Sequence, residues 1–313
     1  MQCLRATLCR RATRRFLAHK LLVRDFTIAI DGPAASGKSS TARALALELG
    51  FGYIDSGSIY RCATLLALRH NITDIGTGAT DLIELINKSS VDIKFQPSTT
   101  RSSPNLITGR LSVPDVRILL NDEDVSEEIR KPGVNRLVAK VASDGEVRTA
   151  VLGIQRALAK AAETRSTDVV DKEGVVSVPG GVVMDGRDIG TTIFPNAELK
   201  IYLDASAMAR AIRRWDEMNS SLKQARAKAP VAAADSAPVA NERAPAEYPS
   251  VEDIARELEE RDYADINRQH SPLRIAKDAV VIDNTTMTFE QQVYSIADLA
   301  RDRMGLERKH DDL

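Results

Sequence analysis

The nine residues Gly32-Pro33-Ala34-Ala35-Ser36-Gly37-Lys38-Ser39-Ser40 have the types and the spacing of a loop that binds phosphate. Glycines at two of its positions let the backbone approach an anion closely, and the N–H groups between them can point at phosphate oxygens. Lys38 adds a positive charge, and the hydroxyl of Ser39 is placed to bind Mg²⁺. The stretch therefore predicts a site for the phosphates of ATP together with Mg²⁺.

The residues on either side of this loop supply the structural context that it needs. Residues 26–31 form an apolar run, and residues 38–49 carry apolar side chains at helical spacing. We therefore expect a buried strand before the loop and a helix after it, whose N-terminus favours a bound phosphate. The alternative, a glycine-rich turn with an incidental lysine, does not explain the full spacing.

Apolar runs that end in aspartate recur along the chain, at residues 51–55, 181–185, 199–204 and 279–283. They alternate with helical patterns, which predicts an α/β fold with one parallel sheet covered by helices on both faces. Ligands of such sheets bind at the carboxyl ends of the strands. We therefore expect the sheet edge that carries the phosphate loop to carry Asp31, Asp55, Asp185 and Asp204 as well.

The segment between the first and the second of these runs has a different pattern. Residues 91–95 and 116–120 alternate polar and apolar side chains and are separated by turn-forming residues, which predicts a small antiparallel sheet. Helical patterns precede and follow it, at residues 57–70, 126–142 and 145–164.

Composition excludes several classes of function. The chain has 313 residues, of which 43% are hydrophobic, and a formal net charge of −1. It can bury a sizeable core but has no overall positive field, so we expect no nucleic acid partner. No run approaches the roughly 18 apolar residues of a membrane span. The cysteines Cys3, Cys9 and Cys62 have neither zinc-ligand nor disulfide spacing.

Residues 1–24 differ in charge from the rest of the chain. They hold seven Arg and Lys residues and no acidic residue, and their leucine and phenylalanine side chains form no continuous apolar core. This composition is typical of a mitochondrial targeting segment and unlike a secretory signal. The alternative is a basic tail on a cytoplasmic protein.

Residues 220–249 are rich in Ala and Pro and contain little that could form a core. We expect a mobile loop here. It would serve as part of a substrate lid or be a tolerated surface insertion.

Three further motifs, taken with the phosphate loop, resemble a known family. They are Asp-Ser-Gly-Ser-Ile-Tyr-Arg at residues 55–61, Asp-Gly-Arg-Asp-Ile-Gly-Thr at 185–191, and Glu-Arg-Asp followed by Asp-Ile-Asn-Arg within 260–268. In this order, from about Phe26 to Arg303, they resemble the bacterial-type cytidylate kinases, which belong to the P-loop nucleoside monophosphate kinases.

The resemblance implies a P-loop kinase fold with a five-stranded parallel sheet, formed by a domain of residues 25–313 after the basic extension. It further implies a monophosphate-binding subdomain at about residues 57–150, which includes the small antiparallel sheet, and a mobile lid at about 205–268. The family resemblance also suggests a monomer.

Site residues follow from the same resemblance. Arginines offer planar forks for the acceptor phosphate, and carboxylates accept hydrogen bonds from a cytosine amino group or from ribose hydroxyls. An isolated arginine would more often form a surface ion pair, but these lie inside matching motifs. The positions that correspond to substrate-binding positions of the family are Ser56, Tyr60, Arg61, Arg148, Arg187, Asp188, Arg261, Asp265 and Arg268.

The resemblance also implies the residues that act on the transferring phosphoryl group. Lys38 and Arg187 would stabilise its charge together with a lid cluster of Arg210, Arg213 and Arg214, which recur at helical spacing. Asp185 or Asp188 would orient the waters of Mg²⁺. Asp185 is the better placed of the two because it directly ends a strand.

The activity that the resemblance implies is transfer of the ATP γ-phosphoryl group to CMP and dCMP. The family usually has Ser where this chain has Ala139, at a position associated with the pyrimidine base, so UMP or another small acceptor is an alternative. A protein that hydrolyses ATP without a small acceptor, as a nucleotide-dependent switch or a nucleic-acid-binding module does, is the competitor from another class.

Overall fold

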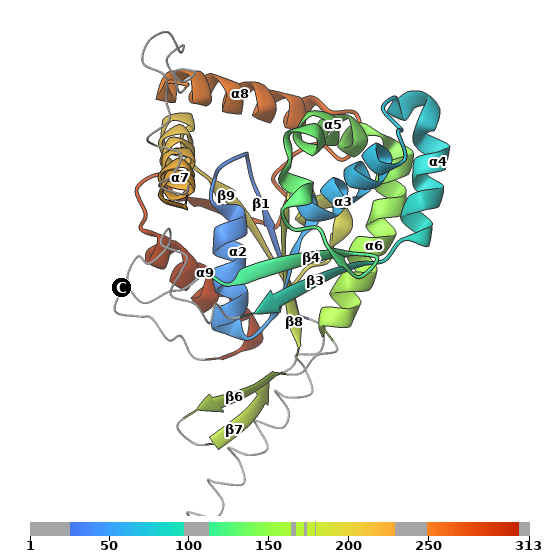
Figure 1. The fold of residues 1–313 in the computed structure, drawn as a ribbon. Helices are drawn as coiled ribbons and strands as arrows, with labels where there is room; N and C mark the ends of the chain where they lie inside the picture. The colour runs from blue at the N-terminus through green and yellow to red at the C-terminus, as the bar shows by residue number, and fades with distance from the viewer. Residues whose placement is uncertain are drawn as a thin grey trace, which may run out of the picture.

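A computed structural model describes residues 26–96, 113–163, 167–171, 174–178, 180–228 and 249–306. Its centre is a five-stranded sheet in the order β10-β9-β1-β8-β2, in which every neighbouring pair is parallel (Figure 1). The α/β prediction is therefore confirmed. The strands are β1 (Phe26–Asp31), β2 (Gly52–Asp55), β8 (Gly181–Gly186), β9 (Leu199–Asp204) and β10 (Val280–Asp283).

Helices cover both faces of this sheet, as Figure 1 shows. Helices α2 (Lys38–Leu49) and α9 (Phe289–Met304) pack on one face, against a core that includes Ile28 and Ile30. Helices α3 (Ser56–Arg69) and α6 (Gly145–Glu163) contribute to the core on the other face, which includes Ala29. All residues of β1 and β8 are buried, which explains why these strands are nearly uniformly apolar.

The segment after α3 carries the predicted antiparallel sheet. Strand β4 pairs antiparallel with both β3 and β5, and the 3-10 helix η1 and helix α5 follow. The helix predicted at residues 126–142 is divided, because Pro132 cannot continue a helix and instead occupies the first turn of α5. These elements are α4 (Ile75–Lys88), β3 (Val91–Gln96), β4 (Asp115–Leu120), β5 (Glu123–Asp124), η1 (Glu128–Arg130) and α5 (Pro132–Ser143).

An antiparallel strand pair and a π-helical segment were not expected from the sequence. Strands β6 (Thr167–Asp171) and β7 (Gly174–Val178) form an antiparallel pair that lies away from the main sheet at the bottom of Figure 1. Directly after β8, residues Ile189–Ile193 form a single π-helical segment, η2. This segment contributes to the site described below.

Helices α7 (Ala207–Lys228) and α8 (Val251–Asn267) pack against one another, and α8 runs along the top of the molecule in Figure 1. The prediction of a loop from residue 220 is wrong for its first nine residues, because α7 continues to Lys228. Residues 220–228 are rich in Leu, Lys, Gln, Ala and Arg, all strong helix formers. The rest of the predicted loop, residues 229–248, and the basic arm of residues 1–24 lie outside the described residues.

The carboxyl ends of the strands meet at one edge, as predicted. Asp55 pairs in register with Asp185 across β2 and β8, and Asp204 pairs with Asp283 across β9 and β10. At this edge Gly32 has φ 150°, and a Cβ on it would lie 2.1 Å from the Leu203 carbonyl oxygen. Only glycine lets the phosphate loop leave β1 so close to β9. None of the helices within the described residues has the length and apolar character needed to cross a bilayer.

Candidate active site

The phosphate loop joins β1 to α2 between the two strands that flank β1. Gly37, with φ 87°, precedes the first turn of α2, so the loop lies at a helix N-terminus where N–H groups are free to bind an anion. The Lys38 ammonium donates hydrogen bonds to the Pro33 carbonyl oxygen and, at 3.2 Å, to Ser36 Oγ. Burial, and then the nearby charge of Arg187, lower the pKa of Lys38 well below its usual value. A bound anion would stabilise the charged form of Lys38 and so oppose both effects on its pKa.

A hydroxyl and a carboxylate meet beside this loop. Ser39 Oγ donates to Asp185 Oδ2 at 2.6 Å, and the Tyr53 hydroxyl donates to Oδ1 at 2.8 Å. Burial, and then the charge of Asp55, raise the pKa of Asp185 to about 6, against the two hydrogen bonds that lower it. The carboxylate is therefore poorly compensated and suited to face a cation.

Asp31 holds the start of η2 against the end of β1. Its two carboxylate oxygens accept from Ile189 N at 2.8 Å and from Gly190 N at 2.7 Å. Burial raises the pKa of Asp31 to about 6, while the two backbone hydrogen bonds oppose the shift. This contact fixes the segment that carries Arg187 and Asp188.

A second cluster lies between α3, α6 and the end of α8. The buried Asp188 forms an ion pair with Arg148 on α6, and its Oδ1 lies 3.5 Å from Arg268 NH2. The Arg148 guanidinium also lies over the ring of Tyr60, 5.3 Å from the ring centre. Burial raises the pKa of Tyr60 to about 12, so its hydroxyl stays neutral. Ser56 is buried at the start of α3.

Arginines from three elements bring positive charge to the space between the phosphate loop and the second cluster. Arg187 Nε donates to Asp265 Oδ2 at 2.8 Å. Loss of surrounding water, and then the charge of Arg187, lower the pKa of Arg261, and the charges of Arg187 and Arg261 also act on Lys38. Because their charges disfavour one another, an anion bound between them would stabilise these cations. Arg61 adds to the field and donates to the Ile129 carbonyl oxygen at 3.0 Å.

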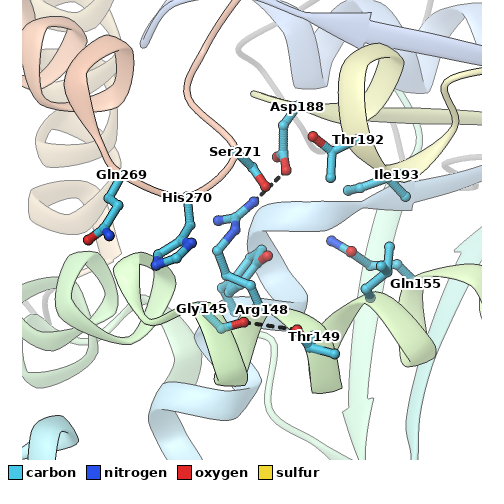
Figure 2. Close-up of a pocket in the computed structure, with 12 residues that line it drawn as sticks. Gly145, Arg148, Thr149, Gln155, Asp188, Thr192, Ile193, Gln269, His270 and Ser271 are labelled. Atoms are coloured by element: carbon cyan, nitrogen blue, oxygen red, sulfur yellow. Dashed lines mark hydrogen bonds and ion pairs between the residues drawn. The ribbon is translucent and has the colours of Figure 1, made fainter.

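A cavity of about 270 Å³ adjoins the second cluster (Figure 2). Its lining includes Tyr60, Arg148, Asp188 and His270, and the amide of Gln155 points into it from α6. Gln155 is 1% exposed, and neither amide atom has a hydrogen-bond partner among the described residues. The cavity is therefore polar on several sides.

The three arginines of α7 do not form one cluster. Arg210 is buried and donates to the Ala34 carbonyl oxygen at 3.0 Å and to Asp262 at 2.5 Å. Arg213 donates to Asn284. Arg214 is exposed and pairs with Glu217 at 3.0 Å. The structure thus places Arg210 against the phosphate loop and Arg213 against Asn284.

Several residues of this region were not singled out from the sequence. Asp262 Oδ1 accepts from Ala34 N at 3.0 Å, Tyr53 contacts Asp185, and Asn284 donates to the Ser36 carbonyl oxygen at 2.8 Å. Asp262 lies inside the Glu-Arg-Asp motif, and Asn284 directly follows a predicted strand, so motif and strand end were available signals. Tyr53 offered none, since a tyrosine in a strand is ordinary.

The donor set beside the loop fits Mg²⁺. In the part of the chain that the structure describes, no group of three or more His, Cys, Asp or Glu side chains is arranged to hold a metal ion alone. Mg²⁺, however, is commonly bound through one or two protein oxygens together with substrate phosphates. Ser39 and Asp185 supply such oxygens next to a phosphate cradle.

The chain is similar to known proteins over nearly all of its length. It matches the family model for cytidylate kinase over residues 28–235 and 238–302. A cytidylate kinase of Streptococcus sanguinis is 34% identical over 279 residues, which are 89% of this chain and 98% of the relative. A cytidylate kinase of Chlorobaculum tepidum is 37% identical over 273 residues, which are 87% and 91% of the two chains.

These relatives contradict the predicted targeting segment and confirm the family resemblance. They are bacterial proteins, so the interpretation of residues 1–24 as a mitochondrial targeting segment is wrong. The resemblance inferred from the four motifs is confirmed. By its match to the family model and by its identity to these relatives, the chain belongs to the cytidylate kinase family.

Proposed function

We propose that the protein transfers the γ-phosphoryl group of ATP to CMP and dCMP, giving ADP and CDP or dCDP. The observation that carries this proposal is that the phosphate loop and a cluster of arginines lie at one edge of the sheet, where each could bind an anion. The phosphate loop lies on one side and the Arg148–Asp188–Arg268 cluster on the other, and the charges of Lys38 and Arg187 influence one another between them. Family membership supports the same activity.

Residues 32–40 hold the donor phosphates. Lys38 leaves its present partner, the Pro33 carbonyl oxygen, and contacts the β and γ phosphates, where a full positive charge is favoured. Ser39 would hold Mg²⁺ through its hydroxyl, with the Asp185 carboxylate beside it. When bound, Mg²⁺ neutralises charge on the triphosphate. We assign the orientation of its waters to Asp185, because Ser39 lies 2.6 Å from it while Asp188 pairs with arginines.

The acceptor occupies the second cluster. Arg61, Arg187, Arg261 and Arg268 bind its phosphate, while Asp188, held by Arg148, accepts a hydrogen bond from the cytosine amino group. Ser56, Tyr60 and Asp265 contact the base and sugar, and Tyr60 lines the adjoining cavity. The attacking oxygen belongs to a phosphate that is already anionic at neutral pH, so no general base is required. Positioning and charge neutralisation supply the catalysis.

We assign residues 57–150 to the monophosphate-binding subdomain and residues 205–268 to the lid, whose closure excludes water that would otherwise hydrolyse ATP. We assign contact with the phosphoryl group to Arg214, which is exposed on α7 and pairs there with Glu217. A monomer suffices, because the described residues of one chain supply both anion sites.

The test is ADP formation from Mg·ATP with CMP, dCMP, UMP, AMP, shikimate or no acceptor in parallel. Stimulation by CMP and dCMP above the other acceptors is expected. A preference for UMP would keep the reaction class and give Ala139, which is exposed on α5, a role in base selection. ADP formation that is indifferent to every acceptor would overturn the kinase proposal in favour of an ATP-hydrolysing switch.

A further inference from the structure

Asn284 lies directly beneath the phosphate loop and is 0% exposed. It follows β10, and its backbone N–H donates to the Asp204 carbonyl oxygen at 2.9 Å, which fixes the residue to the end of β9. Its side-chain Nδ2 donates to the Ser36 carbonyl oxygen at 2.8 Å and to Gln292 Oε1 on α9. A buried amide with such partners has one orientation.

Arg213 completes the surroundings of this amide. Its NH1 donates to Asn284 Oδ1 at 2.9 Å, and its NH2 donates to the Asn284 carbonyl oxygen at 2.7 Å. Both contacts hold the guanidinium against Asn284, on the side away from the cradle. Burial lowers the pKa of Arg213, and the nearby charge of Asp283 opposes that shift. Asn284 thus connects α7 to the phosphate loop.

The contact with Ser36 has a consequence for the anion site. In a trans peptide the C=O and the next N–H point in opposite directions. Because Asn284 holds the Ser36 carbonyl outward, the N–H of Gly37 is aimed into the cradle. The Gly37 carbonyl is held in the same manner, by Thr41 Oγ1 at 2.8 Å, and Gln292 donates to that hydroxyl. Asn284 and Gln292 together therefore set the direction of two successive N–H groups.

We propose that Asn284 is a positioning residue for the phosphate donor and that Arg213 acts through it rather than on the transferring phosphoryl group. The proposal rests on the proposed function in placing the donor in residues 32–40. Asn284 aims the Gly37 N–H at a donor phosphate, and Arg213 holds the Asn284 amide in the orientation that does so. Through this side chain Arg213 of the lid helix α7 is linked to the donor site.

The first test separates donor from acceptor effects. Loss of a buried hydrogen-bond partner is worth about a five- to hundred-fold change in binding. Asn284→Ala should therefore raise KM for ATP about ten-fold or more and leave KM for CMP within about two-fold. Asn284→Asp keeps the acceptor for Arg213 and removes the donor to Ser36, and should show the same split. Equal changes in both KM values, or none, would overturn the proposal.

The second test asks whether Arg213 acts through Asn284. In the wild-type background Arg213→Ala should lower kcat/KM for ATP. In the Asn284→Ala background the same substitution should lower kcat/KM for ATP little further. The same fold loss in both backgrounds would show that Arg213 acts independently of Asn284. Arg256→Ala is the matched control, because Arg256 is an exposed arginine of α8 that pairs with Asp253 on the same helix.

Binding measurements keep this inference separate from the proposed function. The affinity of each variant for Mg·ADP, measured by calorimetry without any acceptor, should fall in Asn284→Ala and Asn284→Asp even if CMP proves not to be the acceptor. Unchanged Mg·ADP affinity in both variants, with far-UV circular dichroism like that of the wild type, would contradict the positioning role. A wild-type enzyme that ignores CMP would contradict the proposed function alone.

Discussion

Ser39 and Asp185, 146 positions apart in the chain, meet through a 2.6 Å hydrogen bond from Ser39 Oγ to Asp185 Oδ2. The contact forms because β1 and β8 are neighbours in the sheet, with Ile30 in register with Asp185. It brings a hydroxyl from the start of α2 and a carboxylate from the end of β8 to the same side of the phosphate loop.

The first prediction concerns this carboxylate. Asp185→Asn should lower kcat about ten- to hundred-fold and weaken the apparent affinity for Mg²⁺, because groups that orient a metal and its ligands typically have effects of this size. Tyr53→Phe removes the hydrogen bond from the Tyr53 hydroxyl to Asp185 and should lower kcat about five-fold. Steady-state rates over a Mg²⁺ titration measure both effects. An Asp185→Asn enzyme with wild-type Mg²⁺ dependence would contradict the assignment.

The second prediction concerns Lys38. Lys38→Met should reduce transfer about a thousand-fold or more, since a preorganised charge next to the moving group is lost. The fold should survive, because Lys38 is 5% exposed with its pKa lowered by burial, and methionine fills similar space without a charge. Rates of CDP formation and thermal unfolding test the two parts separately. Near-wild-type turnover would refute the role given to Lys38.

The third prediction concerns base selection. Asp188→Asn should lower kcat/KM for CMP relative to UMP about ten-fold or more, because an amide can donate to the uracil carbonyl where a carboxylate cannot. The variant also leaves Arg148 without its buried counter-charge and should be less stable by about 3 kcal/mol. An unchanged CMP/UMP ratio in a folded variant would place the base elsewhere.

The fourth prediction is a pH dependence of stability. Burial raises the pKa of Asp31 from 3.8 to about 6. Between these values the folded state binds more protons than the unfolded state, so the free energy of unfolding falls as pH rises. The contribution is full below about pH 4 and lost above about pH 6, and at 1.36 kcal/mol per pKa unit it amounts to about 3 kcal/mol.

Urea unfolding at about pH 4 and pH 7 measures this contribution. The Asp31→Asn variant has no carboxyl group at this position to titrate. From about pH 4 to pH 7 its free energy of unfolding should therefore fall by about 3 kcal/mol less than that of the wild type. The variant is expected to be less stable overall, because an amide cannot accept from both Ile189 N and Gly190 N. Parallel losses in the two proteins would show that Asp31 does not titrate in this range.

The sequence by itself determined the parts of this protein that depend on local pattern. The glycine spacing around Lys38, the apolar run before it and the helical period after it predicted the strand, loop and helix that the structure contains. The strand ends at Asp55, Asp185 and Asp204 predicted one functional edge, because parallel strands place their carboxyl ends together. Composition alone gave a wrong prediction for the basic arm, because a high arginine content is not specific to mitochondrial targeting segments.

Only the tertiary structure decided which residues of distant segments meet. Helical spacing placed Arg210, Arg213 and Arg214 near one another on α7. Whether each arginine faces a phosphate or a protein group depends on Asp262 and Asn284, which lie 52 and 71 positions away. Likewise the sequence favoured Asp185 over Asp188 as the carboxylate near Mg²⁺ only because Asp185 ends a strand. The structure gives these two residues different partners, because β8 carries Asp185 to Ser39 while Arg148 of α6 pairs with Asp188. Such pairings arise from packing across the whole chain, which no local pattern encodes.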